Sequence, residues 1–221
     1  MVKKFVLVLA LLLSVSIFAQ KEMYELRVYE LKFGKPANIL HNYFENALIP
    51  ALNRQEIKNI GVFEEVGDAL PKNIYVFIPF KNMEAYQKVY EALKIDTTFK
   101  NDSKAYNETD EQEFPYVGYS TSFFIAFEGF PNLVKPNEDD SLFELRIYEG
   151  YNEDAFLRKV KMFNESEFKI FEDVGLRPVF FGEQISGNHM PNLTYMLAFK
   201  DMNDHDVTWR KFGPHRGHSY L

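Results

Sequence analysis

An internal repeat constrains the fold of this chain more than any other feature of the sequence. The segment YELRVYE starts at residue 24 and returns as FELRIYE at residue 143, a spacing of 119 residues. The segment FKNM at 80–83 returns with the same spacing as FKDM at 199–202. Repetition over this distance indicates two copies of one unit of roughly 100 residues. We therefore expect a duplicated domain in which both copies form the same fold.

Alternating residues predict the strands of the first unit, residues 20–128, and apolar residues at helical spacing predict its helices. The expected strands cover 24–31, 60–66, 74–80 and 119–127, the expected helices cover 36–59 and 83–93, and a long loop covers 96–115. Pro50 is expected to kink or divide the first helix. The order strand, helix, strand, strand, helix, strand is the ferredoxin-like α+β plan, with both helices on one face of the sheet.

The second unit, residues 142–221, repeats this order after a linker at 129–141 that is rich in proline and acidic residues. Its expected elements are strands at 142–149, 179–184 and 193–199 and helices at 153–174 and 203–212, with Gly175 as a helix cap. The sequence contains no counterpart of the strand at 119–127. Either the unit lacks this edge strand or the reading frame is cut or shifted near Pro214. The second explanation is favoured because a missing strand exposes apolar surface.

Residues 1–19 have the pattern of a signal peptide. Lys3 and Lys4 precede an apolar run from Phe5 to Phe18, and Ala19 offers a small residue for cleavage. The run is shorter than the roughly 20 residues that a membrane-spanning helix needs, and a retained anchor is the alternative. We expect export, to the periplasm or the medium, and no membrane attachment after the signal is removed.

The composition narrows the classes of partner. The formal net charge is −7, which argues against nucleic acid because phosphate binding needs a basic surface. The chain has no cysteine, so its stability depends on the core rather than on disulfides. Its 22 Phe and 13 Tyr residues predict a core in which aromatic packing dominates. Homo-oligomerisation stays open.

The repeated first strand offers a candidate pocket. Two ferredoxin-like sheets in one chain are expected to pack face to face into a barrel, since otherwise each would expose an apolar face. Leu26 and Val28 are expected to point to the helices and the alternate residues to the barrel interior. There an arginine could hold a carboxylate or enolate of a small polar or aromatic ligand, or each Glu–Arg pair could simply satisfy itself. The candidate pocket residues are Glu25, Arg27, Tyr29, Glu144, Arg146 and Tyr148.

The histidines are weaker candidates. His41 lies in the first expected helix and could act as an acid or base, although a histidine on a helix is more often structural. His205, His215 and His218 cluster near Asp201 in the sequence, but their spacing fits no metal template. The sequence also has no phosphate loop and no Gly-x-Ser-x-Gly motif. We therefore predict neither a metal nor a cofactor.

The repeated strand motif resembles the signature of the NIPSNAP family. So does the run Pro191–Met202 that leads to Trp209 and Phe212, where Trp209 corresponds to Tyr90 of the first unit. The resemblance implies a dimeric α/β-barrel fold, as in the wider superfamily of small barrel monooxygenases and haem-binding barrels. It supplies no agreed catalytic residues. Residues 216–221 depart from the family pattern.

Three functions follow from these observations. The preferred one is an exported, non-enzymatic barrel that binds a small molecule. The first alternative is a cofactor-independent monooxygenase or isomerase acting in the barrel interior, with Arg27 or Arg146 stabilising an enolate and Tyr29, Tyr148 or His41 moving a proton. The second alternative is a structural or assembly protein whose interior is filled.

Overall fold

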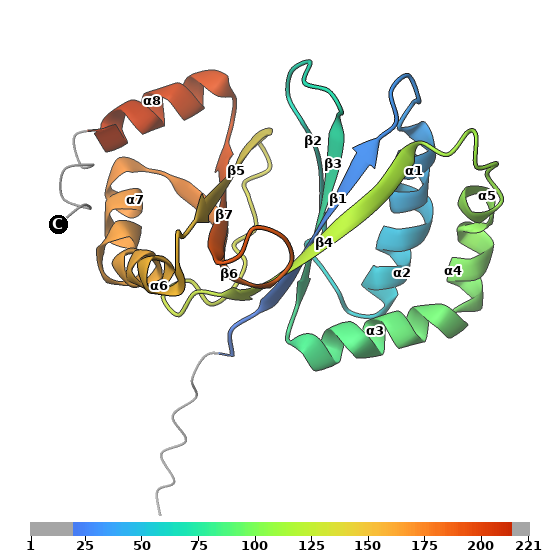
Figure 1. Ribbon diagram of the computed structural model, residues 1–221, viewed down its shortest axis with the longest axis horizontal. Coiled ribbons are helices and arrows are strands. Elements are labelled where there is room, and N and C mark those ends of the chain that lie inside the picture. The colour runs from blue at the N-terminus through green and yellow to red at the C-terminus, as the bar shows by residue number, and fades with distance from the viewer. Residues whose placement is uncertain (1–19, 214–221) are drawn as a thin grey trace, which may run out of the picture.

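The computed structural model describes residues 20–213. One antiparallel sheet of seven strands runs through both units, and helices cover its two outer sides (Figure 1). Within this range no helix is long and apolar enough to cross a membrane. The predicted signal peptide and the chain after Gly213 lie outside the described residues.

The first unit holds four strands. Its elements are β1 (Met23–Leu31), α1 (Asn38–Tyr43), the π-helical turn η1 (Phe44–Leu48), α2 (Ile49–Arg54), β2 (Gly61–Glu64), β3 (Asn73–Phe80), α3 (Met83–Ile95), α4 (Thr97–Asp102), α5 (Lys104–Asn107) and β4 (Tyr116–Ala126).

The second unit holds three strands in the described part of the chain. Its elements are β5 (Leu142–Glu149), α6 (Glu153–Met162), the π-helical turn η2 (Phe163–Glu167), α7 (Phe168–Val174), β6 (Arg177–Ser186), β7 (Asn192–Phe199) and α8 (Met202–Phe212). Gly175 caps α7 in the left-handed conformation, at φ 82°, which a glycine adopts without steric cost.

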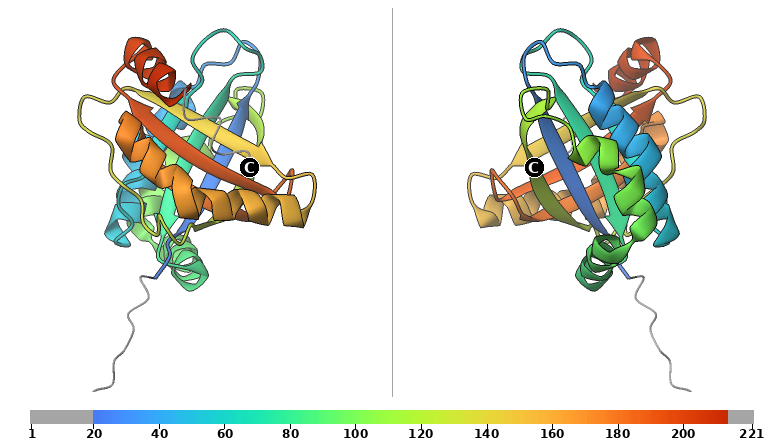
Figure 2. Two further views of the ribbon diagram at one scale, coloured as in Figure 1. Left: turned by 90° about the vertical axis from the view of Figure 1, so that its left-hand side faces the viewer. Right: turned by 90° about the vertical axis from the view of Figure 1, so that its right-hand side faces the viewer.

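The strands follow the order β2-β3-β1-β4-β6-β7-β5. The first four strands have the ferredoxin-like order. The last three, β6-β7-β5, repeat the order β2-β3-β1 of the first unit. Antiparallel pairing of β4 with β6 joins the two units, and the sheet curls so that its halves face each other between the two helical layers (Figure 2). The predicted tandem ferredoxin-like α+β fold is confirmed. The two edges of the sheet are β2 and β5.

The first helix of each unit is interrupted at the same place. In the first unit η1 ends just before Pro50, as a kink at that proline would suggest. The second unit has the same turn, η2, with Lys169 at the position that corresponds to Pro50. Because a lysine does not force a break, the turn belongs to the repeated fold and not to the proline alone.

The predicted loop at 96–115 is wrong in part, because it contains α4 and α5. The carboxylate of Asp96 accepts a hydrogen bond from the backbone N–H of Phe99 at 2.9 Å, which caps α4. Tyr106 then stacks on Tyr43 with ring centroids 4.0 Å apart. A side-chain cap and aromatic packing on α1 thus stabilise two short helices in a polar segment.

Among residues 20–213, three apolar clusters form the core. Two lie between the sheet and the helices, one in each unit. The third fills the interior between the two halves of the sheet, where Phe77 of β3 stacks on Phe180 of β6 at 4.4 Å. Leu26 and Val28 belong to this interior cluster, so the predicted facing of β1 is wrong: these residues point inward and the alternate ones point to the helices. The buried members of the interior cluster are Tyr24, Leu26, Phe77, Phe124, Ala126, Val179, Phe180, Met196 and Ala198.

A substitution at Gly182 tests the junction between the units. A Cβ at this position in β6 would lie 2.6 Å from the Cβ of Phe124 in β4, so one strand would have to shift. We expect Gly182→Ala to lower the free energy of unfolding by about 1–3 kcal/mol, measured by urea denaturation. Gly118→Ala is the matched control, because nothing lies within 4 Å of its Cβ position; equal effects of the two variants would refute the tight junction.

Candidate functional site

The first copy of the Glu-x-Arg-x-Tyr strand forms a closed polar cluster under α3. The Arg27 guanidinium donates to both carboxylate oxygens of Glu25, at 2.8 and 3.2 Å, and also contacts the Tyr90 hydroxyl. The hydroxyls of Tyr90 and Thr121 donate to the same carboxylate, at 2.9 and 3.0 Å. Every charge in the cluster therefore has a partner, as burial requires.

Burial makes this first cluster a structural one. Glu25 is 1% exposed and Arg27 is 6% exposed. Burial lowers the pKa of Arg27, but Tyr90 and Glu25 outweigh that effect, so the pKa is raised and the guanidinium stays charged. Tyr29 stacks on Tyr119 of β4 at 4.9 Å and closes the cluster from the side. The charges of the first copy thus satisfy each other, and both charged side chains are shielded from solvent.

The second copy keeps the Glu–Arg pair and an aromatic partner on the helix, but its arrangement is open. Arg146 donates to Glu144 at 3.2 Å, and the Trp209 indole N–H, on α8, donates to the other oxygen of Glu144 at 2.8 Å. The Arg146 guanidinium lies 4.5 Å from the Trp209 ring and 5.8 Å from the Tyr148 ring. The side chains of Glu144 and Arg146 are 27% and 26% exposed. Both line a cleft of about 450 Å³ with His205, Asp206, Trp209, Arg210 and Gly213.

The difference between the copies has a topological cause. In the first unit β4 lies beside β1 and supplies Thr121 and Tyr119 to the Glu25–Arg27 pair. Over residues 20–213 no strand lies on the equivalent side of β5. The same motif is consequently sealed in one unit and open to solvent in the other.

Electrostatics keep Arg146 charged in the open cleft. Partial burial lowers its pKa, but the neighbouring Tyr195, Tyr148 and Glu144 outweigh that effect and the pKa is raised. A guanidinium between aromatic rings with one accessible side suits a planar anion, since arginine binds carboxylates through two parallel N–H groups and stacks on aromatic faces.

His205 and Trp209 complete the cleft, and the sequence prediction did not assign them to it. The His205 ring lies 3.5 Å from the Glu144 carboxylate through Nε2 and 2.8 Å from that of Asp206 through Nδ1. One signal was present: residues four apart share a helix face, so His205 and Trp209 were expected on the same face of the helix. The sequence did not show that this face meets the Glu-x-Arg-x-Tyr side of the strand.

The other histidine candidates lie elsewhere. His41, on α1, pairs with Glu64 at 2.7 Å and is half-exposed, so it joins neither Arg27 nor Arg146. Across the part of the chain that the structure covers, no group of three His, Cys, Asp or Glu residues could hold a metal ion. His215 and His218 lie outside that part.

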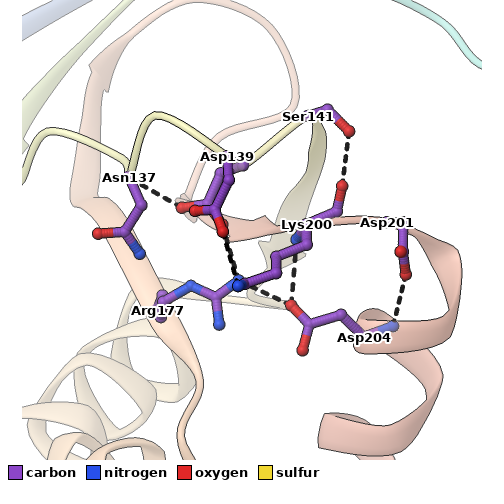
Figure 3. A network of polar contacts seen from close by, with 8 residues as sticks. Asn137, Asp139, Ser141, Arg177, Lys200, Asp201 and Asp204 are labelled. Carbon is purple, nitrogen blue, oxygen red and sulfur yellow. Dashed lines mark hydrogen bonds and ion pairs between the residues drawn. The ribbon is translucent and has the colours of Figure 1, made fainter.

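A polar network fixes α8, and with it Trp209, on the second unit (Figure 3). Arg177 of β6 donates to Asp140 of the linker at 2.8 Å and to Asp204 of α8 at 2.7 Å. Lys200 pairs with Asp139 at 2.6 Å. Arg177 and the backbone N–H of Lys200 hold the pKa of Asp204 below its usual value. The acidic linker is thus bound to the unit whose helix carries the cleft.

Solved structures share this fold. A candidate monooxygenase from Fusobacterium nucleatum superposes with a TM-score of 0.58 at 8% identity, covering 91% of this chain and 87% of its own. A second one, from Lactobacillus acidophilus, gives 0.55 at 8% identity, covering 85% and 81%. Identity this low shows the fold alone. The class is that of tandem ferredoxin-like barrels.

The family match covers a smaller part of the chain than the structural matches do. Residues 24–117 match the family model NIPSNAP, so the first unit contains a NIPSNAP domain and the resemblance is confirmed there. The run Pro191–Met202, which also carried the resemblance, lies outside the matched residues. A NIPSNAP-family protein of unknown function from Agrobacterium tumefaciens aligns at 18% identity with a TM-score of 0.36, covering 48% of this chain and 89% of its own. No curated protein matches the chain.

A buried carboxylate in the second unit offers a stability test. Glu167 of η2 is 5% exposed, its Oε2 has no hydrogen-bond partner, and the first unit has Leu48 at the corresponding position. Burial raises the pKa of Glu167, and Lys159 only partly opposes this. We expect Glu167→Leu to raise the free energy of unfolding at pH 7 by about 1–3 kcal/mol.

The pH dependence of that gain has a defined sign. A folded-state pKa above the unfolded one means that the folded protein binds more protons, so wild-type stability falls as the pH rises through the unfolded pKa toward the folded one. The advantage of Glu167→Leu should therefore be small near pH 4 and grow toward neutrality in urea melts. Glu165→Leu, on the exposed side of the same turn, is the control; a gain independent of pH would contradict this account.

Proposed function

We propose that this protein is a non-enzymatic binding protein that holds a small planar anion, such as an aromatic carboxylate, in the cleft of the second unit. The observation that carries this proposal is the contrast between two equivalent arginines. Arg27 is sealed by its partners, whereas Arg146 presents part of its guanidinium to the cleft. In the first unit the partners of the motif shield the arginine from solvent. In the second unit the Arg146 guanidinium is still accessible, so it is available for a ligand.

The chemistry of the lining supports an aromatic carboxylate. Glu144 occupies only part of Arg146, which has five N–H donors in a fixed plane. The Trp209 ring beside the guanidinium offers a stacking surface. Arg146 and Arg210 balance Glu144 and Asp206 in charge, so a single carboxylate meets no excess of negative charge.

The alternative of oxygenase or isomerase chemistry inside the barrel receives less support. It needs an acid–base group in the interior. The interior cluster offers only tyrosines for this role, and the buried Asn192 and Thr194, on the face of β7 that carries Met196, are neither acids nor bases. The hydroxyl of Tyr24 donates to Glu22 at 3.3 Å, and burial raises the pKa of Tyr24, so that phenol stays protonated. A filled structural barrel agrees better with this interior, but it leaves the open cleft unexplained.

Binding measurements test the proposed site. Titration calorimetry with benzoate, indole-3-acetate and acetate should show that the aromatic anions bind and acetate does not. Arg146→Gln should weaken aromatic anion binding at least tenfold, because the glutamine amide has neither the positive charge nor the two parallel N–H donors of the guanidinium. Trp209→Leu should weaken it too.

Arg27→Gln is the matched control, since it alters the sealed copy of the motif. It should lower the melting temperature and leave the dissociation constant of the folded protein unchanged. Equal binding by wild type and Arg146→Gln, or loss of binding only in Arg27→Gln, would overturn the assignment of the cleft. Native mass spectrometry of protein purified from its own host would identify a ligand retained by wild type and absent from Arg146→Gln.

We also propose export of the protein, which the basic start and the apolar run of residues 1–19 support. The expected mature N-terminus is Gln20. Edman sequencing of the protein from the periplasmic or culture fraction checks this, and replacing Leu11 and Leu12 by arginine should retain the protein in the cytoplasm. A mature protein that still begins at Met1 in the membrane fraction would indicate a retained anchor.

A further inference from the structure

The two edge strands of the sheet lie side by side and enclose an apolar groove. Phe63 of β2 contacts Phe143 of β5, with ring centroids 4.9 Å apart. We call this groove the seam. It has a volume of about 480 Å³. Its lining is mostly apolar and consists of Phe63, Glu64, Glu65, Val66, Ala69, Tyr75, Leu142, Phe143, Glu144, Leu145, Ile147, Met196, Met202 and His205.

The internal repeat shows what fits the seam. In the first unit β4 pairs antiparallel with β1 along its length and antiparallel with β6 over residues 123–126. β5 and β2 are the repeat counterparts of β1 and β6. A strand placed in the seam as β4 is placed in the first unit would therefore pair antiparallel with β5 and β2, and it would close the barrel.

The burial of the repeated strand supports a missing neighbour. β1 has strands on both sides, and six of its nine residues are buried. All eight residues of β5 are partly or fully exposed. Ile147 is 56% exposed although Leu145, on the same face, packs on the interior cluster. Within residues 20–213 the apolar interior is thus covered by a strand between β1 and β6, whereas no strand covers it between β5 and β2.

The charge of the lining selects the occupant. Glu64, Glu65 and Glu144 line the seam, and no lysine or arginine belongs to its lining. A docked strand gains its main-chain hydrogen bonds from the edges and its specificity from alternate side chains. Complementary charge requires basic residues at the ends of such a strand, because carboxylates beside it would repel acidic ones.

We propose that the seam binds an extended segment of a partner protein, about eight to eleven residues long, with apolar residues at alternate positions and basic flanks. The segment adds as an antiparallel strand between β5 and β2. This proposal does not depend on the small-molecule function, although Glu144 and His205 line both the seam and the cleft.

The docked strand would also cover the cleft. In the first unit the Tyr119 ring of β4 lies 5.6 Å from the Arg27 guanidinium. A residue at the corresponding place in the seam would lie over Arg146. Partner binding and small-anion binding are therefore expected to exclude each other where both occur.

A labelled peptide tests the proposal by fluorescence anisotropy on the full chain. The probe is the β4 sequence YVGYSTSFFIA with two lysines at each end. A peptide with four glutamates in place of the lysines, and one with proline at the central threonine, should each bind at least tenfold more weakly, because the first meets like charge and the second lacks a strand N–H. Ile147→Asp should weaken binding at least tenfold.

Ile185→Asp is the matched control, because Ile185 is 45% exposed on β6, between β4 and β7. Equal binding of all three peptides, or equal effects of the two isoleucine variants, would overturn the proposal. Binding only to a variant that ends at Gly213 would assign the seam to residues 214–221. A dimer that Ile147→Asp dissociates, without peptide binding, would assign it to a second copy. Either result overturns the partner segment, while benzoate binding to wild type tests the cleft independently.

Discussion

The pairing of β4 with β6 is the interaction on which the rest of this structure depends. It covers only a few residues of each strand, yet it turns two sheets of four and three strands into one curled sheet. Gly182 permits the close approach to Phe124 at this junction. Because the sheet curls, Phe77 and Phe180 from different units meet in the interior, and the same curvature places the edge of β2 beside the edge of β5.

The duplicated Glu–Arg pair shows how topology changes the role of one motif. Both copies lie between the sheet and a helix that carries an aromatic residue, Tyr90 or Trp209. Removing two charges from water is costly unless each has partners, and the first copy has them because β4 adds Thr121 and Tyr119. The second copy keeps solvent on one side instead, so its arginine is both charged and accessible. The Glu–Arg pair that only stabilises the first unit is therefore available for binding in the second.

Sequence reasoning predicted the fold well and the site only in part. The 119-residue repeat and the strand and helix patterns specify the ferredoxin-like order, because period and repeat are local properties of the chain. The facing of β1 was predicted wrongly, since alternation identifies two faces but not which one meets the helices. Apolar Leu26 suits either face. In the structure Glu25 faces the helices, where the Tyr90 hydroxyl of α3 donates a hydrogen bond to its carboxylate. The buried Glu167 was also beyond prediction, since its burial depends on where η2 packs.

The two edges of the seam differ in a way that bears on how a strand would bind. β2 has four residues and carries Glu64 at its end, which are features that protect an edge from unwanted pairing. β5 has eight residues, so most of the main-chain hydrogen bonds available to a docked strand lie along it. Affinity should therefore come mainly from β5 and the apolar groove beneath it, while the carboxylates of Glu64 and Glu65, at the end of β2, select the charge of the segment. A long edge on β5 for main-chain pairing, together with a short and acidic edge on β2, favours a specific partner strand over indiscriminate association.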